Sequence, residues 1–239
     1  MKHLKTIAKI FGLLLWTGGV MLLTEIILAY LFYFLLGRET LQTPVWTTVV
    51  NALIYATAFF LTVFLPVKFK KMRPPTRKDL GLEGLLTWTD LGLVVAGFIA
   101  YLILAMILMN LFSNFSFFDA SQTQELGYNL ITGFDRLVAY FALCIIAPIA
   151  EELTFRGWLY DKLRKLIPGK KLSIVLSSLL VSILFGLMHG QWNVGVNVFA
   201  MSLVLCTLRE ITGTTYSGIL LHMLKNTIAF VLVYLVGFI

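Results

Sequence analysis

Long apolar runs, separated by short charged or proline-containing stretches, dominate this sequence. An α-helix needs about 20 mostly apolar residues to cross the hydrocarbon core of a bilayer. Runs of that order cover about residues 7–36, 44–66, 90–111, a stretch that begins near 135, and then 172–189, 194–208 and 214–237. The pattern therefore predicts an all-α, polytopic transmembrane helical bundle. We expect about seven to eight spans. The number is not fixed, because 7–36 is long for a single crossing and the 112–134 loop is long for a simple connection.

Composition supports this class and narrows the function. Apolar residues make up 59% of the 239 positions and charged residues only 13%, which excludes an ordinary soluble domain. The net charge of +7 comes from basic residues beside the apolar runs, so membrane topology explains it better than nucleic-acid binding does. Both cysteines, Cys144 and Cys206, lie within apolar runs and indicate neither a disulfide framework nor a metal cluster.

Charge between the spans predicts the topology. Residues 68–78 hold six basic side chains and two prolines, and the 161–171 turn is also basic, whereas the 112–134 loop holds Asp119 and Glu125 and no base. The positive-inside bias then predicts a multi-pass protein of the cell membrane with a cytoplasmic N-terminus. Residues 79–89 are expected to form a short interfacial helix. We divide the chain into an N-terminal transmembrane region, 1–134, with three spans, and a C-terminal core, 135–239, with four.

Ionisable residues inside the spans are the first candidates for function. Glu151, Glu152 and Arg156 interrupt the fourth span, where charged groups are expensive and usually functional. On a helix, Glu152 and Arg156 are i and i+4 and can pair, whereas Glu151 points about 100° away. Two carboxylates in different environments can divide acid and base roles. A purely structural ion pair is the alternative. Glu25 in the first span is expected to face the bundle interior.

Two of the three histidines also lie in apolar runs. If Lys170 is the apex of a helical hairpin, Glu151 lies nineteen residues before it and His189 nineteen after it. At 1.5 Å per residue both side chains are about 25–29 Å from the turn, so they can face each other. In the last span His222 and Asn226 are i and i+4 and share one helix face.

These side chains predict hydrolysis of an amide or ester. A carboxylate and an imidazole can hold and deprotonate a water molecule, and a second imidazole with an amide can donate hydrogen bonds to an oxyanion. Glu151, His189 and His222 could instead bind zinc. However, the sequence has no His-Glu-x-x-His motif, and the Arg156 cation would repel a metal. No cofactor is therefore favoured, and zinc remains an alternative.

Three short motifs in this order resemble the CAAX protease and bacteriocin-processing (CPBP, or Abi) family of intramembrane proteases, which includes Rce1-type prenyl-protein endopeptidases. The resemblance covers about residues 135–230. It rests on Glu151-Glu152-x-x-x-Arg156, Phe185-x-x-x-His189 and His222-x-x-x-Asn226, with the flanking Ala147-Pro148-Ile149-Ala150 and Arg156-Gly157.

The resemblance implies roles for all six residues. Glu151 and His189 would activate water, His222 and Asn226 would form the oxyanion site, and Glu152 and Arg156 would position and support them.

The function expected from the resemblance is cleavage of a peptide or protein segment within the bilayer. It would serve peptide maturation, CAAX-type processing or bacteriocin self-immunity, by a glutamate-type or metal-dependent mechanism, and the oligomeric state is left open. One alternative is a catalytically silent membrane scaffold that binds a peptide or a sensor kinase. The other is a transporter with Glu25 and Glu151 as ion sites.

Overall fold

The protein is a bundle of helices. A computed structural model describes residues 2–41, 43–69, 71–120 and 133–236, and every regular element in these segments is helical. Seven stretches of these segments are long and apolar enough to cross a membrane, which confirms the all-α, multi-span prediction. In order the elements are α1 (Lys2–Leu41), α2 (Pro44–Lys68), α3 (Trp88–Phe112), α4 (Phe134–Tyr140), η1 (Phe141–Ile146), α5 (Ala147–Glu152), η2 (Leu153–Leu159), α6 (Tyr160–Leu166), α7 (Lys170–Leu187), α8 (Trp192–Thr212), α9 (Tyr216–Val231) and η3 (Leu232–Val236).

Local sequence explains several helix ends. Pro44 starts α2, where its missing N–H has no helical partner to lose. The Thr87 and Asp90 side chains each bind the other's backbone N–H, and this capping box starts α3. Gly213 ends α8 with a left-handed φ of 71°, which a residue without Cβ adopts readily. The first helix is longer than expected, because α1 continues past a kink at Gly37 to Leu41.

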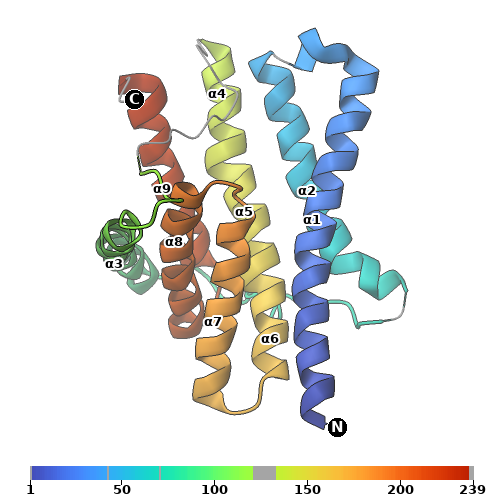
Figure 1. Ribbon diagram of the computed structural model, residues 1–239, viewed down its shortest axis with the longest axis vertical. Helices are drawn as coiled ribbons and strands as arrows, with labels where there is room; N and C mark the ends of the chain where they lie inside the picture. The colour runs from blue at the N-terminus through green and yellow to red at the C-terminus, as the bar shows by residue number, and fades with distance from the viewer. Residues whose placement is uncertain (1, 42, 70, 121–132, 237–239) are drawn as a thin grey trace.

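The elements from α5 to α8 form the centre of the bundle (Figure 1). In Figure 1, α1 and α2 flank them on one side and α3 lies on the other. The N-terminal end of α1 and the turn between α6 and α7 lie at one end of the molecule, and the C-terminal end of the described chain lies at the other. The basic turn therefore shares an end with the N-terminus, as the charge pattern predicted. Glu125, part of the predicted acidic loop, lies outside the described residues.

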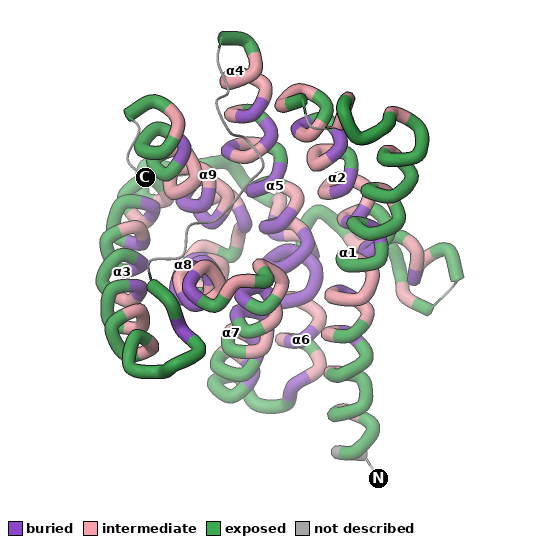
Figure 2. The backbone as a smooth tube through the Cα atoms, turned by 45° about the horizontal axis from the view of Figure 1, so that its top comes forward, coloured by how far each residue is buried: buried purple, intermediate pink, exposed green. Residues whose placement is uncertain are grey.

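Close packing is concentrated between α7 and α8. A Cβ added to Gly186 would lie 2.8 Å from the Gly195 carbonyl oxygen, so the two backbones can approach only because both residues are glycine. Figure 2 shows the buried residues gathered in the centre of the bundle, whereas much of α1 is exposed. The exposed side chains of the membrane-spanning helices are largely apolar, as a lipid-facing surface requires.

Two sequence predictions about the first half are wrong. Glu25 is an exposed residue of α1 and does not face the bundle interior. Residues 79–89 do not form an interfacial helix, because turns occupy 77–81 and helix resumes only at Trp88. The reason is that the Asp79 side chain caps a turn by binding the backbone N–H of Thr76, and the loop then docks on the bundle.

This loop, residues 73–82, closes the end of the bundle where α6, α8 and α9 meet. Asp79 binds Arg73 and Lys165 of α6, each with a shortest N–O distance of 2.8 Å. Burial by itself would raise the pKa of Asp79, but the hydrogen bonds from Arg73, Lys165 and Thr76 outweigh it and hold that pKa well below its usual value. Thr215, just before α9, donates its backbone N–H to the Gly81 carbonyl.

Candidate functional site

The adjacent glutamates lie in the middle of a helical span that two π-helical turns interrupt. The short helix α5 ends at Glu152, between η1 and η2, and the path from α4 to α6 runs continuously through the bundle (Figure 1). π-Helical turns are rare and frequently occur at functional sites. Here they flank the six residues Ala147–Glu152 on both sides, so they set how both carboxylates are presented.

Glu152 is completely buried and forms an ion pair with Arg156. The Arg156 Nη1 atom lies 2.9 Å from Glu152 Oε1, and the two side chains are 1% and 0% exposed. The guanidinium carbon also lies 4.5 Å from the centre of the Phe185 ring. The i, i+4 spacing predicted this pair. Its burial and its stacking on α7 make it a fixed support of the site and keep it away from solvent.

His222 lies between the two glutamates. Its Nδ1 atom is 3.0 Å from Glu152 Oε1, and its Nε2 atom is 3.7 Å from Glu151 Oε2. A carboxylate held by Arg156 accepts hydrogen bonds and donates none, so Nδ1 carries the proton of this contact. Glu152 therefore fixes the orientation of the imidazole ring, and Nε2 faces Glu151.

Glu151 is buried but less tightly held than Glu152. Its side chain is 11% exposed, and its contact with His222 is longer than a hydrogen bond. The carboxylate that the sequence left without an arginine partner is thus the more available of the two. It can accept a proton from a third molecule, which the Glu152 carboxylate, bound by Arg156 and His222, is poorly placed to do.

His189 follows α7 in the turn that leads to α8. Its Nδ1 atom lies 2.8 Å from the Phe185 carbonyl oxygen. Since a carbonyl only accepts, Nδ1 carries the hydrogen and Nε2 is left with a free lone pair. Both imidazoles pack edge-on against Phe185, with ring centres 5.1 Å away for His189 and 6.0 Å for His222. Among the described contacts of His189, none is a direct ion pair with Glu151.

Asn226 is tied to the span that carries the glutamates. Its Nδ2 atom donates to the Leu143 carbonyl of η1 at 2.9 Å. An amide nitrogen has two N–H groups, so one remains for another acceptor. All six predicted residues thus come from α5, η2, the α7–α8 turn and α9. Direct contacts, or contacts through Phe185, link five of them, whereas Asn226 is joined to the span of the glutamates through Leu143.

The arrangement of the side chains that could bind zinc bears on whether the site holds a metal. Within the described segments no three His, Cys, Asp or Glu side chains are arranged to hold a metal ion. Arg156 bonds Glu152, and Glu152 shares His222 with Glu151, so a fixed cation is already part of this network. The chemistry proposed for this site therefore relies on the side chains of the protein alone.

Sequence reasoning missed Lys225 as part of the site. Its ammonium group interacts electrostatically with Glu151 and with His189, although it occupies one of the unspecified positions of the third motif. The signal was available, because a lysine within an apolar run, three residues after His222, meets the same criterion that singled out the glutamates.

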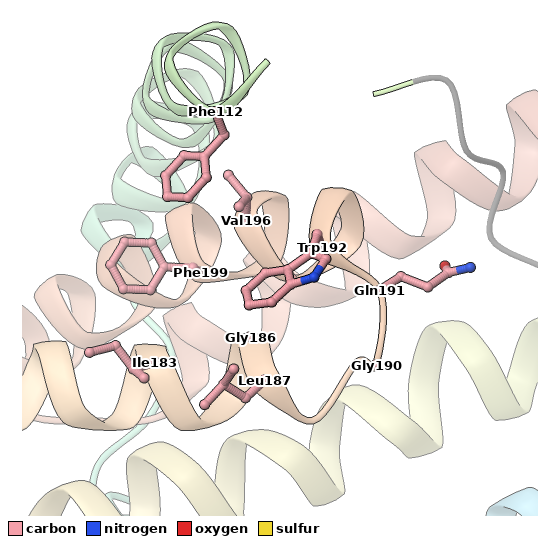
Figure 3. Close-up of a pocket in the computed structure, with 10 residues that line it drawn as sticks. Phe112, Ile183, Gly186, Leu187, Gly190, Gln191, Trp192, Val196 and Phe199 are labelled. Atoms are coloured by element: carbon pink, nitrogen blue, oxygen red, sulfur yellow. The ribbon is translucent and has the colours of Figure 1, made fainter. Parts of the chain in front are cut away.

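An apolar pocket adjoins the turn that carries His189. Its volume is about 410 Å³, and Figure 3 shows aromatic rings from α3 and α8 around it, with Gln191 pointing away. Gly190, Gln191 and Trp192, which directly follow His189 in the sequence, line this pocket, so the pocket lies next to the candidate site. Its lining comprises Phe112, Ile183, Gly186, Leu187, Gly190, Gln191, Trp192, Gly195, Val196 and Phe199.

Comparison with known families agrees with the geometry. Residues 133–228 match the family model described as type II CAAX prenyl endopeptidase Rce1-like, about 40% of the chain, and this segment contains every residue of the site. Searches of curated proteins and of solved structures gave no match. The three motifs lie on adjoining helices of the segment that the family model matches, so residues 133–228 are similar to Rce1-like endopeptidases, and the seven apolar helices make this an integral membrane protein.

Proposed function

We propose that this protein is an intramembrane endopeptidase that cleaves a peptide bond with a water molecule activated by Glu151 and His189. The observation that carries the proposal is that the two adjacent glutamates have different partners. Glu152 is held by Arg156, whereas Glu151 faces the His222 imidazole at 3.7 Å and has no basic hydrogen-bond partner among the described residues.

The first chemical step follows from these positions. A water molecule between Glu151 and His189 loses a proton to the Glu151 carboxylate, and His189 Nε2 accepts a hydrogen bond that orients it. The water oxygen bonds to the carbonyl carbon of the substrate, and the carbonyl π electrons move to its oxygen. Asn226, through its second N–H, and His222 in its protonated form, through Nε2–H, stabilise that oxyanion.

The second step returns the proton. Glu151, now protonated, donates to the leaving amine as the tetrahedral intermediate collapses and the C–N bond breaks. The Glu152–Arg156 pair takes no part in these transfers. It holds the His222 ring in its reactive orientation before the substrate binds, so the ring does not have to be oriented during the reaction.

The family description suggests the kind of substrate. We propose a prenylated or otherwise apolar peptide segment that enters from the bilayer or the cytoplasmic side, with its hydrocarbon chain in the pocket beside His189. Peptide maturation, CAAX-type processing and bacteriocin self-immunity are the roles consistent with such a substrate. We place the protein in the cell membrane with its basic, N-terminal end in the cytoplasm.

The test compares peptides from membranes that contain wild-type protein or the Glu151→Gln variant. Glu25→Gln is the matched control, because Glu25 is an intramembrane glutamate on the exposed surface of α1. Purified protein is then given the identified segment with and without a prenyl group. We expect cleavage by wild type and Glu25→Gln, and a loss of at least about a hundredfold in Glu151→Gln.

Two outcomes would overturn the proposal. Unchanged peptide profiles with a phenotype that survives Glu151→Gln would favour the scaffold. Proton-driven flux in liposomes that disappears in both glutamate variants, with no cleavage, would favour the transporter. Equal cleavage of both peptides would reject the prenyl-binding part of the proposal alone.

A further inference from the structure

The bond between Asn226 and Leu143 has a specific origin in the backbone of the fourth span. In η1 the helical hydrogen bonds join residue i to residue i−5, and the series reaches Ala147, whose N–H donates to the Ala142 carbonyl. The next bond of the series would join residue 148 to the Leu143 carbonyl. Residue 148 is proline, which has no N–H. The Leu143 carbonyl is therefore left without that donor.

Asn226 of α9 supplies the missing donor. Its Nδ2 atom lies 2.9 Å from the Leu143 oxygen. Within a membrane-embedded bundle a backbone carbonyl without a partner is costly, because water is not at hand to satisfy it. The carbonyl that Pro148 leaves free is thus a strong and localised acceptor, and it lies in the same span as Glu151.

We infer that Pro148 is a positioning residue that acts through Asn226: it frees the Leu143 carbonyl, and this carbonyl holds the Asn226 amide with its second N–H in the catalytic site. This inference rests on the proposed function. It assigns a role to a proline that lies three residues before Glu151 and cannot itself exchange a proton or contact the oxyanion through a polar side-chain atom.

The arrangement explains why a proline is compatible with the middle of this span. Proline inside a helix normally removes one hydrogen bond and destabilises the helix. Here the lost bond is replaced by a tertiary one, so the defect in one helix becomes a tether between η1 and α9. An amide fixed through one N–H keeps a single orientation, which is what an oxyanion donor needs.

The test is a double-mutant cycle on the purified full-length protein. Pro148→Ala restores an N–H that competes with Asn226 for the Leu143 carbonyl. Asn226→Ala removes the donor. The matched control is Pro66→Ala, since Pro66 is also a buried proline within a helix, α2. We measure kcat, KM and the midpoint of thermal unfolding for each variant and for the Pro148→Ala/Asn226→Ala pair.

We expect Pro148→Ala to lower kcat about tenfold with KM within about twofold, a part of the 10²–10³ lost when an oxyanion donor is removed. Its unfolding midpoint should be at least that of wild type, because the helix regains a hydrogen bond. The double variant should match Asn226→Ala, because the proline has no second route to the reaction.

Losses that add in the double variant, or an unchanged kcat in Pro148→Ala, would overturn the inference. If Pro148→Ala and Pro66→Ala lower the unfolding midpoint and the activity to the same extent, the inference would also be overturned, since that result describes packing alone. Glu151→Gln is assayed in parallel. If it is as active as wild type, the proposed function fails on separate grounds.

Discussion

Arg156→Met tests the support beneath the catalytic residues. The substitution keeps a long, unbranched side chain but removes the cation from a pair whose side chains are 1% and 0% exposed. Breaking a buried ion pair from one side costs about 3–5 kcal/mol, because the remaining charge is left without a partner. The stacking of the guanidinium 4.5 Å from the Phe185 ring contributes up to about 2 kcal/mol of that loss when desolvated.

The assay is reversible unfolding in mixed micelles, with Arg77→Met in the exposed loop as the control. We expect Arg156→Met to lower the free energy of unfolding by about 3–5 kcal/mol and the control by less than about 0.5 kcal/mol. Glu152→Gln in the Arg156→Met background removes the orphaned charge and should recover most of the loss. If Arg156→Met lies within about 1 kcal/mol of wild type, the pair does not support the site as we argue.

Three further predictions concern charge in and around the site. Lys225→Met should lower kcat/KM about tenfold, because the Lys225 cation stabilises the negative charge of the Glu151 carboxylate. Lys225→Arg keeps the cation and should largely preserve kcat/KM. Steady-state kinetics checks this, with the exposed Lys171→Met as the control. A chelator should leave activity unchanged, with a zinc protease inhibited in parallel; a loss that zinc restores would reject the metal-free mechanism. Folding lowers the pKa of Asp79, so its ionised carboxylate stabilises the loop fully at any pH above the pKa that Asp79 has in the unfolded chain. Protection of the 73–82 loop from proteolysis should therefore stay constant from about pH 8 to 5 and fall only below about pH 4. Asp79→Asn should lose that protection at all pH values, whereas the exposed Glu83→Gln should keep it.

The fold class and six of the candidate-site residues could be predicted from the sequence alone, whereas Lys225 was missed. Apolar runs of spanning length admit little besides transmembrane helices, because every backbone polar group in lipid must be satisfied internally. Charges inside such runs are conspicuous for the same reason, and this signal singled out Glu151, Glu152 and Arg156. Helical spacing then predicted which glutamate pairs with Arg156.

The connections between those residues could be found only from the folded protein. Helical spacing describes one helix, so it could not show that His222 of α9 bonds Glu152, that both imidazoles pack on Phe185, or that the Asn226 amide binds a carbonyl of η1. The π-helical turns add further rotation that no regular period predicts. For the same reason Glu25, a charge in an apolar run, was wrongly expected inside the bundle: the face that a helix buries is set by its neighbours.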